Sequence, residues 1–513
     1  MPNRLFLLLF IFSANSSFSQ TLEWHNISTP DNFINSTYFH APMAESEEGI
    51  WVTSVVDNQE IISTLEYGKV KLRKFSTDGN LVNEETLEGK CHVAKIKSIG
   101  EDLFMHIIIR DSLLLNDTWI IPENGFREDL FVKRNSQGVY TYHNLGNIEI
   151  AAVGISSEGH FIYSGQNGFG GSVELKVIDL DGEIVATKSL PQIGYVANIE
   201  EKADGQGYIL LGSCAESTTI DFFEIEPPSF YNNYILSLDE NLNLEWFKII
   251  EDISCVKSFG WSNNGVSYWY GGTAIAPNFE GLTYEGPNEI GMDFFLSRID
   301  GNGISWVKET PGSSGWYGAF PAEQQALGVD ENYNAYIIGF TRGNSISWQD
   351  GLTAENAGGR DIFIASYNPS GELRWAKTFG SINYDMGLSI YVTAVDEFYI
   401  TASTRDDITI DGVEIDAGTG SILLAKFNSD DLSTENISDP SLSVFPNPTS
   451  GELHIQSSSQ PTESRLIDPN GKILEKWMNE IPSEINLNRF PKGLYFLSVQ
   501  NSKGVSVRKV IKN

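Results

Sequence analysis

The sequence contains few residue patterns that could perform chemistry. It has no His-Glu-x-x-His, Gly-x-Ser-x-Gly, phosphate-binding loop or Cys-x-x-Cys motif. Its 7 histidines are scattered along the chain, and His92, which follows Cys91, forms the pair of reactive side chains to inspect first. We therefore predict no catalytic residue, no metal site and no cofactor.

The 3 cysteines indicate neither a disulfide-stapled fold nor a zinc site. Cys91 and Cys255 fall on what we expect to be equivalent innermost strands of non-adjacent repeats, where buried thiols are a better interpretation than metal ligands. Cys214 is expected to be an unpaired strand residue. The segment Asp179–Glu183 looks superficially like a calcium loop, but its carboxylates fall short of the roughly six to eight oxygen ligands that Ca²⁺ takes.

A short loop motif with a carboxylate recurs between strands, and it is our candidate binding surface. Its copies read Ile220-Asp221-Phe222, Phe279-Glu280-Gly281, Trp348-Gln349-Asp350-Gly351 and Ile410-Asp411-Gly412, with Leu115-Asn116-Asp117 as a weaker fifth copy. Aromatic rings beside carboxylates suit a sugar or a peptide. We therefore predict ligand contacts at Phe279, Glu280, Trp348, Asp350 and Asp411. The alternative is a hairpin that caps each repeat, with its aromatic ring buried and its acid solvated, and the regular repetition favours this alternative.

The elements that position these loops are repeated strands. Seven copies of a hairpin pattern, in which Asp, Asn, Ser and Gly mark the turn, start at Leu72, Phe131, Leu175, Leu236, Leu296, Ile364 and Leu424. A further apolar strand precedes each copy, starting at Gly49, Asp102, His160, Gly207, Gly265, Asn334 and Glu397. This pattern predicts an all-β, seven-bladed β-propeller with four-stranded blades over residues 20–427.

The two ends of the repeat region complement each other. The seventh hairpin lacks its Trp-bearing strand, whereas residues 20–27 contain Trp24 in a context that matches Trp246, Trp306 and Trp375. We therefore expect the N-terminal strand to complete the last blade and close the ring. An open array or two β-sandwiches is the alternative, and neither explains this match.

The repeats resemble a known family. Residues 358–381, "GGRDIFIASYNPSGELRWAKTFGS", with "AYIIGFTRG" before them, are similar to the bacterial β-propeller repeats abbreviated SBBP. The resemblance is best over residues 207–427 and weakens toward the N-terminus. Because that family is defined by blade structure, it implies a fold and says little about activity.

The first residues resemble an export signal. Arg4 precedes an eight-residue apolar core, and Ser17-Phe18-Ser19 places small residues before a predicted cleavage site at Gln20, so residues 1–19 are predicted to be a signal peptide. Eight helical residues reach about 12 Å, far less than the roughly 30 Å of a bilayer core. We predict no transmembrane segment. The protein is therefore expected to be exported.

The charge balance excludes some partners. The 513 residues include 68 acidic and 34 basic side chains, for a net charge of -34. This field repels phosphate backbones and anionic headgroups, so we predict no nucleic-acid partner. The acidic character belongs to the body of the chain, because the tail after a polar linker at 428–441 has more basic than acidic residues.

The tail, residues 442–513, reads as short strands with Asn-Pro, Asp-Pro-Asn-Gly and Pro-Lys-Gly turns, which predicts a small β-sandwich. It resembles the type A C-terminal sorting domain of the type IX secretion system of Bacteroidota. The matching residues are Pro446, Asn447, Pro448, Gly451, Gly471, Gly493, Tyr495 and Lys509. The resemblance implies handling by that machinery, removal of the tail, and either release or attachment to the outer cell surface.

Three functions remain open from the sequence. The leading hypothesis is a non-catalytic, surface or released binding and adhesion platform for a glycan or protein ligand. The second is a polysaccharide-active hydrolase or lyase, which would need acids and a His or Tyr converging on the central channel. The third is a purely structural surface role.

Overall fold

The computed structural model is all-β, as predicted. It describes residues 20–29, 40–62, 65–123, 127–148, 150–165, 171–229, 232–251, 258–273, 277–282, 293–310, 318–343, 345–348, 353–418, 420–429, 443–447, 449–456, 463–467, 473–478, 480–501 and 504–512. These residues form strands and no helix, and none of them belongs to a helix that could span a membrane. The chain divides into a body, Gln20–Asn428, and a second unit that contains Ser429–Asn513. The predicted signal peptide lies outside the described residues.

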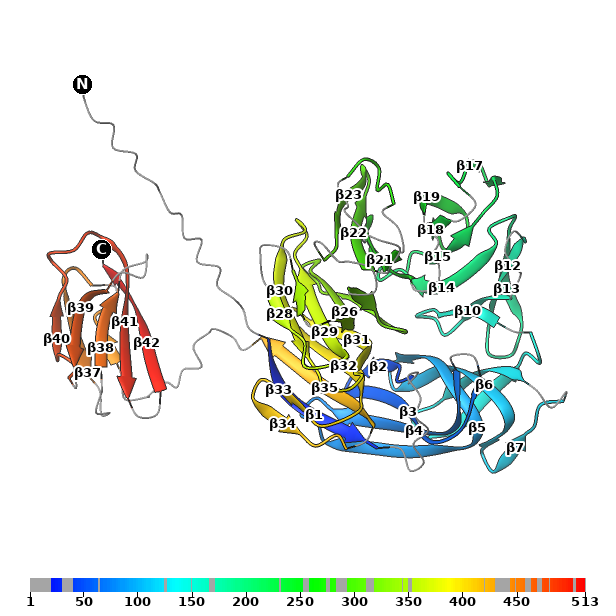
Figure 1. Ribbon diagram of the computed structural model, residues 1–513, viewed down its shortest axis with the longest axis horizontal. Coiled ribbons are helices and arrows are strands. Elements are labelled where there is room, and N and C mark those ends of the chain that lie inside the picture. The colour runs from blue at the N-terminus through cyan, green and yellow to red at the C-terminus, as the bar shows by residue number, and fades with distance from the viewer. Residues whose placement is uncertain are drawn as a thin grey trace, which may run out of the picture. The chain divides into compact units, whose positions relative to one another are not determined.

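The body is a series of antiparallel sheets that follow one another along the chain (Figure 1). Two four-stranded sheets come from its middle. The first is β10 (Ile150–Ile155), β11 (Phe161–Gly165), β12 (Val173–Ile178) and β13 (Ile184–Leu190), and the second is β14 (Tyr195–Glu201), β15 (Tyr208–Cys214), β18 (Asn232–Leu238) and β19 (Leu244–Glu251).

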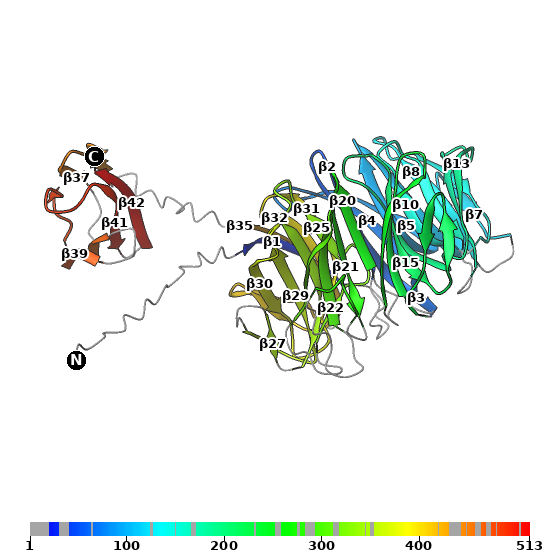
Figure 2. The same cartoon turned by 90° about the horizontal axis from the view of Figure 1, so that it is seen from above.

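The next two sheets repeat this order. One is β20 (Ser258–Asn263), β21 (Val266–Thr273), β22 (Asp293–Asp300) and β23 (Gly303–Lys308). The other is β24 (Ala319–Pro321), β26 (Ala335–Arg342), β29 (Arg360–Tyr367) and β30 (Leu373–Phe379), with β25 (Leu327–Val329) also paired to β26. We call the first strand of each of these sheets the inner strand and the last strand the outer one. Figure 2 shows the same sheets in a second view.

The first part of the body departs from the expected separate four-stranded blades. Its strands join in one eight-stranded sheet of β2 (Met43–Ser46), β3 (Gly49–Ile62), β4 (Leu65–Ser76), β5 (Leu81–Ile99), β6 (Asp102–Leu115), β8 (Glu128–Arg134) and β9 (Tyr140–Asn144), with β7 (Thr118–Ile120) on β6. The long strand β5 pairs with β4 and then with β6; the β4 pairing shifts register between Leu87 and Cys91, and the β6 pairing shifts between Gly89 and Cys91. No turn separates the two halves, because a bulge at Gly89, where a Cβ would lie 2.1 Å from the Ser112 carbonyl oxygen, redirects the strand instead.

The N-terminal strand lies where the sequence places it. The last sheet of the body has the order β1 (Gln20–Ser28), β35 (Ser421–Ser429), β32 (Glu397–Thr404), β31 (Met386–Ala394), so its outer strand comes from the start of the chain. Lys426 on β35 forms an ion pair of 3.0 Å with Glu23 on β1. The sheet therefore has four strands only because the two ends of the body meet.

Outer strands pack onto the turn of the next sheet through an aromatic ring. Trp306 on β23 donates Nε1–H to the Pro369 carbonyl at 3.0 Å, and a Cβ on Gly371 would lie 2.9 Å from its ring. Trp24 on β1 does the same to the first hairpin of the body, with a bond of 2.9 Å to the Thr77 carbonyl and a Cβ on Gly79 2.6 Å from the ring. The turn glycines, at φ 80° and 81°, thus leave room for the rings.

Buried aromatic and aliphatic residues fill the space between the sheets. All seven residues of β18 are buried, whereas outer strand β13 is largely exposed, as expected when the middle strands pack on both faces. Rings stack both between sheets, Trp375 of β30 with Phe398 of β32 at 5.6 Å, and within a sheet, Phe398 with Phe427 of β35 at 5.3 Å. Packing of this kind stabilises the body without disulfides, since the described cysteines Cys91 and Cys214 are free and buried. Cys255 lies outside the described residues.

The C-terminal unit contains two sheets. One is β36 (Ser443–Phe445), β37 (Glu452–Gln456) and β40 (Glu484–Asn486). The other is β39 (Ile473–Met478), β38 (Glu463–Ile467), β41 (Gly493–Asn501) and β42 (Gly504–Lys512). Leu453, Leu466, Leu497 and Val510 are buried in a core of their own. Lys512 is nearly buried, and its ammonium group donates to the Leu487 carbonyl at 2.9 Å, so the end of the chain is tied to the 487–490 turn.

We expect the contact of Trp24 with the first hairpin to matter for the stability of the whole body. Removing residues 20–27 from the mature chain should lower Tm sharply, because β35 becomes an open edge and the Thr77 turn loses its cover. Trp24→Ala alone should cost about 3 kcal/mol, the lower end for loss of a large aromatic ring. Differential scanning calorimetry measures both, with the chain beginning at Gln20 as the reference. An unchanged transition after the deletion would contradict this account.

Candidate functional site

The predicted loop residues occupy separate hairpins and do not converge. The hairpins are β16 (Thr218–Ile220) with β17 (Phe223–Ile225), β27 (Ser345–Ser347) with β28 (Thr353–Glu355), β33 (Ile408–Ile410) with β34 (Val413–Ile415), and a bridge between Phe279 and Leu282. Phe279 and Trp348 are almost fully buried, so their rings are not available to a ligand. Asp350 lies outside the described residues.

The acids of these hairpins are structural contacts between sheets. Glu280 accepts a hydrogen bond of 2.9 Å from the backbone N–H of Ile304 and forms an ion pair with Lys248, which belongs to the preceding sheet. Asp411 accepts a bond of 2.9 Å from Leu22 N–H and pairs with Lys377 of the preceding sheet at 2.6 Å.

Asp221 repeats the arrangement with Leu244 N–H, at 2.8 Å, and with Lys188. Phe279 and Trp348 are thus buried as the capping alternative expects, whereas Phe222 of the Asp221 copy is 98% exposed, and the acids are not simply solvated. Each holds its own outer strand and the neighbouring sheet together.

The environment of these carboxylates favours their charged form. Partial burial raises the pKa of Glu280, but the Ile304 N–H and the Lys248 ammonium outweigh burial and the net pKa is lowered. The pKa of Asp221 is lowered in the same way, against burial, by Lys188 and by Leu244 N–H. All three acids also have positive φ, from 52° to 55°, the left-handed turn conformation. The sequence signal for these ion pairs is a lysine two positions after Trp246 and Trp375.

The body contains a cavity of about 760 Å³ that the loop motif does not predict. Its wall comes from the inner strands β5, β10, β14 and β20 and from residues 323–325, with contributions from β4 and β6. The Gln324 side chain accepts from Ala41 N–H at 3.0 Å and that of Gln325 from Met43 N–H at 3.1 Å, which fixes the segment before β2 against this wall. The cavity therefore combines residues from nearly the whole body.

Two histidines and a tyrosine meet in the cavity wall. The rings of His40 and His92 form an edge contact at 4.5 Å, and Tyr67 lies 6.0 Å from His92. Because a carbonyl can only accept, His92 donates Nδ1–H to the Glu66 carbonyl at 3.0 Å, which leaves Nε2 as its acceptor. Burial lowers the pKa of His40 to about 4 and that of His92 well below its usual value, so both rings are neutral at neutral pH.

A second polar cluster lies in the same wall. His106 Nε2 is 2.9 Å from Oδ1 of the fully buried Asp129, and the Arg127 guanidinium donates to both oxygens of this carboxylate at 3.0 and 3.1 Å. Burial raises the pKa of Asp129, but its bonds with His106 and Arg127 outweigh burial and lower it. The ionised carboxylate thus orients an imidazole and a guanidinium at the cavity.

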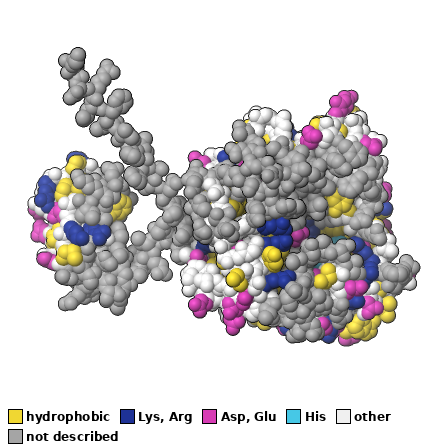
Figure 3. All heavy atoms as spheres, viewed as in Figure 1, with side chains coloured by type: hydrophobic (Ala, Val, Ile, Leu, Met, Phe, Trp, Pro, Cys, Tyr) yellow, Lys and Arg dark blue, Asp and Glu magenta, His cyan; other side chains and the backbone are white. Residues whose placement is uncertain are grey.

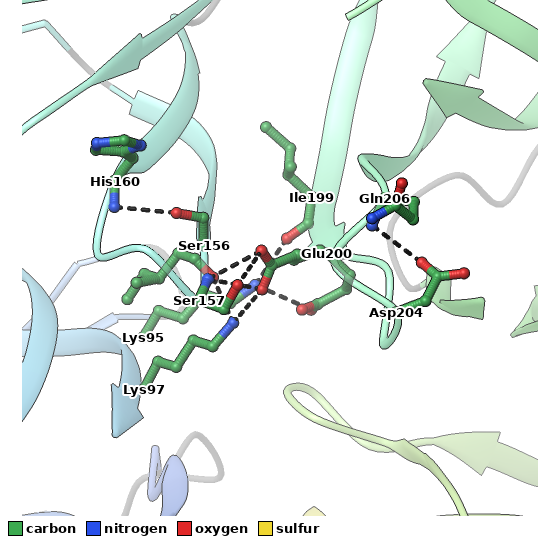
Figure 4. Close-up of polar contacts among 11 residues, drawn as sticks. Lys95, Lys97, Ser156, Ser157, His160, Ile199, Glu200, Asp204 and Gln206 are labelled. Carbon is green, nitrogen blue, oxygen red and sulfur yellow. Dashed lines mark hydrogen bonds and ion pairs between the residues drawn. The ribbon is translucent and has the colours of Figure 1, made fainter. Parts of the chain in front are cut away.

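Lysines of β5 join sheets beside the cavity, as Figure 4 shows. Lys95, which also lines the cavity, donates to the Ile199 carbonyl at 2.8 Å and to Glu200 at 2.9 Å. Lys97 donates to the Ile155 carbonyl at 2.9 Å and to Glu201, whose carboxylate also accepts from Ser157 N–H. These half-buried charges are paired, so they are part of the frame of the cavity.

Two polar atoms in the wall stand out because they make no such bonds. Nδ1 of His40 and Nε2 of Gln324 are buried without a hydrogen-bond partner among the described residues. Such atoms are costly, and they mark a place where a polar ligand would be stabilising. The described residues hold no group of three or more His, Cys, Asp or Glu that could bind a metal.

The sequence did not reveal this site. Of its members, only His92 had been singled out, because it follows Cys91. His40, His92 and His106 are far apart along the chain, and only strand order and register bring them together: His92 lies opposite Ile108, two residues from His106, in the β5–β6 pairing.

Comparison with known proteins identifies the C-terminal unit. Residues 443–513 match the secretion system C-terminal sorting domain. The sequence-based resemblance of the tail is therefore confirmed, and the domain implies secretion to the cell exterior or outer surface. No curated protein matches the chain.

Similarities to solved structures are weak. Hydrazine synthase of Kuenenia stuttgartiensis is 10% identical over 66% of this chain and 80% of that chain, with a TM-score of 0.37. Acylaminoacyl peptidase of Pyrococcus horikoshii is 10% identical over 80% of this chain and 57% of that chain, with a TM-score of 0.34. A structure titled as the Dos1 propeller is 8% identical over 80% of this chain and 95% of that one, with a TM-score of 0.34. These values carry no inference about activity.

Replacing Glu280 should change how stability depends on pH. Since the folded-state pKa of Glu280 is below its usual 4.5, its carboxylate stabilises the fold above that pH and loses this effect as the pH falls further. Glu280→Gln should therefore be less stable than the parent at neutral pH, and the difference should shrink in acid. Urea unfolding across this range measures the effect, with exposed Glu224→Gln as the matched control. A difference that is independent of pH would refute the ion-pair account.

Proposed function

We propose that this protein is an exported, non-catalytic binding platform whose ligand occupies the cavity of the body. The observation that carries the proposal is the wall of that cavity, where His40 and Gln324 each bury a polar atom without a partner beside the rings of Tyr67 and His92. Hydrogen-bonding groups on a mostly preformed concave surface are what a small polar ligand requires.

We infer that the sheets of the body form a closed, seven-bladed propeller of the SBBP-like kind. The eight-stranded sheet would then supply blades one and two, with β5 as the outer strand of the first and the inner strand of the second. The contact of Trp24 with the Thr77 turn supports closure, because it joins the last sheet to the first as Trp306 joins two consecutive sheets. The C-terminal unit would be a small two-sheet sandwich, and residues 1–19, 20–427, 428–441 and 442–513 would be signal, propeller, linker and sorting domain.

The chemistry of the cavity suits a glycan. Neutral imidazoles and a phenol both donate and accept, as sugar hydroxyls do, and Asn198 and Gln325 in the wall add amides. The charged groups Asp129 and Arg127 are already bonded to each other, so they orient the wall. A base with a pKa of about 4, as at His40, is weak at neutral pH, which favours binding over turnover.

A polysaccharide-active enzyme is the second candidate, because Tyr67, His92 and His106 line the cavity together with the acids Glu200 and Glu323. Incubating the protein with a polymer that it binds, and following reducing ends and unsaturated products, separates the two functions. Turnover that is lost in Tyr67→Phe would establish the enzyme. Binding without turnover supports the platform.

We predict that cavity variants lose ligand binding while the fold persists. His92→Gln and Tyr67→Phe remove a ring and a hydroxyl from the wall, and each should weaken retardation in gels cast with the bound glycan by about tenfold, the value of one or two hydrogen bonds. Asp411→Asn is the matched control, since it changes a sheet-to-sheet contact away from the cavity. Equal retardation of all variants would contradict binding in the cavity.

The tail residues have different structural positions. Pro446 and Asn447 are exposed, and Gly451 lets Asn488 approach so closely that a Cβ would lie 2.0 Å from its Oδ1. Tyr495 is buried and donates its hydroxyl to the Pro491 carbonyl at 2.6 Å, while Gly493 opens β41. Pro448 and Gly471, and the side chain of Lys509, lie outside the described residues. We propose that Pro446 and Asn447 face the secretion machinery and that Tyr495 maintains the domain.

Deleting residues 443–513 should abolish delivery to the cell exterior. The body is a separate compact unit, so the truncated chain should fold and accumulate inside the cell envelope. Immunoblots of fractionated cells measure this, with Arg489→Gln, an exposed residue of the tail, as a control that is still secreted. Secretion of the truncated chain at the normal level would contradict the role of the tail.

A further inference from the structure

We propose a second binding site on the body, formed by the guanidinium groups of Arg342, Arg360 and Arg405 with the ring of Tyr384, that takes the carboxylate or sulfate groups of an acidic polysaccharide. None of these residues lines the cavity, so the site is independent of the ligand proposed there. On the face of the body in Figure 3, Lys and Arg side chains gather in a few groups.

The backbone brings the three arginines together. Arg342 ends β26 and Arg360 begins β29, and the two residues are directly opposite each other in the antiparallel pairing. Arg405 follows β32, and its N–H donates to Asp385 at 2.9 Å, while Asp385 N–H donates to the Arg360 carbonyl at 2.9 Å. Like charges that face each other across strands are destabilising, so this arrangement needs a compensating reason.

Aromatic rings hold the guanidinium groups in place. Phe320 and Phe340 are buried and stacked, with centroids 5.1 Å apart, and Arg342 lies 4.8 Å from the first ring. Arg360 lies between Phe340, at 5.0 Å, and Tyr384, at 5.2 Å. Such contacts orient the planar groups before a ligand arrives.

Nearby carboxylates are committed to the backbone rather than to Arg360. Asp361 accepts from Ala357 N–H and Gly358 N–H, and Asp385 accepts from Ser381 N–H and its hydroxyl. Among the described residues the Arg360 guanidinium contacts the Met386 sulfur and the two rings, with no carboxylate at ion-pair distance. Asp406 also lies near Asp385, so acids and arginines alternate here, and the distinguishing feature is an Arg360 guanidinium held by rings.

Electrostatics and exposure agree with an anionic ligand. Burial and the neighbouring Arg360 charge lower the pKa of Arg342, and burial lowers that of Arg405, where Arg360 adds to the effect against the opposing charge of Asp385. A bound anion would relieve this repulsion. Tyr384 is 50% exposed and Ile382 is 76% exposed, so an apolar rim beside the charges can contact the face of a sugar ring.

An acidic polysaccharide fits better than a nucleic acid. Guanidinium groups bind oxyanions in bidentate geometry, so closely spaced guanidinium groups suit a chain that carries repeated anionic groups. The net charge of -34 repels a densely charged phosphate backbone, whereas screening over about 8 Å at physiological salt lets a local cluster act on a sparser chain. The sorting domain also implies secretion to the cell exterior or outer surface.

The test is affinity electrophoresis of the full mature chain in gels cast with polygalacturonate, dextran sulfate or neutral dextran. We expect retardation in one or both charged gels, none in dextran, and an affinity about tenfold or more lower in Arg342→Gln/Arg360→Gln. Retardation in the first gel alone identifies carboxylate as the ligand group, and in the second alone, sulfate. Added salt should weaken binding.

Matched variants keep the outcome decisive. Arg298→Gln, an arginine paired with Asp300 in a different sheet, should bind like the parent, and Tyr384→Ala should weaken binding without a change in Tm because its ring is half exposed. The cavity variant His92→Gln should still bind the charged polymers, so failure of the cavity proposal is distinguishable. No retardation of the parent by either charged polymer, or equal retardation of the arginine double variant, would overturn the proposal.

Discussion

The structure of the body depends on one contact between the ends of its chain. Trp24 on the N-terminal strand covers the hairpin turn at Thr77–Gly79, while the strand itself completes the sheet that ends with β35. A sheet edge left open there would expose unpaired N–H and C=O groups, and the space occupied by the ring would be a cavity. All the inner strands that form the wall of the cavity are positioned by the same series of sheets.

Buried and half-buried carboxylates make two kinds of polar contact in the body. At the rim, Asp221, Glu280 and Asp411 each bind an outer-strand N–H and a lysine of the preceding sheet, which fixes one sheet against the next. In the cavity wall, Asp129 bonds to His106 and Arg127 and so orients groups toward an open space. The first arrangement satisfies every group it uses. The second lies beside His40 and Gln324, which each retain a buried polar atom without a partner among the described residues. This difference distinguishes the contacts that stabilise the fold from those of the candidate binding site.

Charge is unevenly distributed over the chain. The body is acidic, yet Arg342 and Arg360 meet at the Phe340 ring, and Arg360 has no acid at ion-pair distance among the described residues. Local guanidinium groups act over a few ångströms, whereas the net charge acts through screened solvent. Under the proposal above, the arginine site would act locally on a glycan in a protein that is sorted to the cell exterior.

The sequence by itself determined the all-β class, six hairpins with their Asp, Asn and Gly turns, the pairing of residues 20–27 with the last sheet, and the sorting tail, because each depends on local periodicity or on a contiguous motif. It did not determine that β5 runs unbroken through two groups of strands, since a bulge at Gly89 leaves no turn signal. The burial of Phe279 and Trp348 agrees with the capping alternative, but the sequence did not show that Glu280 and Asp411 would each pair with a lysine of the preceding sheet. Only tertiary structure decided that His40, Tyr67 and His92 share one wall, because register and the order of inner strands bring together residues that no spacing along the chain relates.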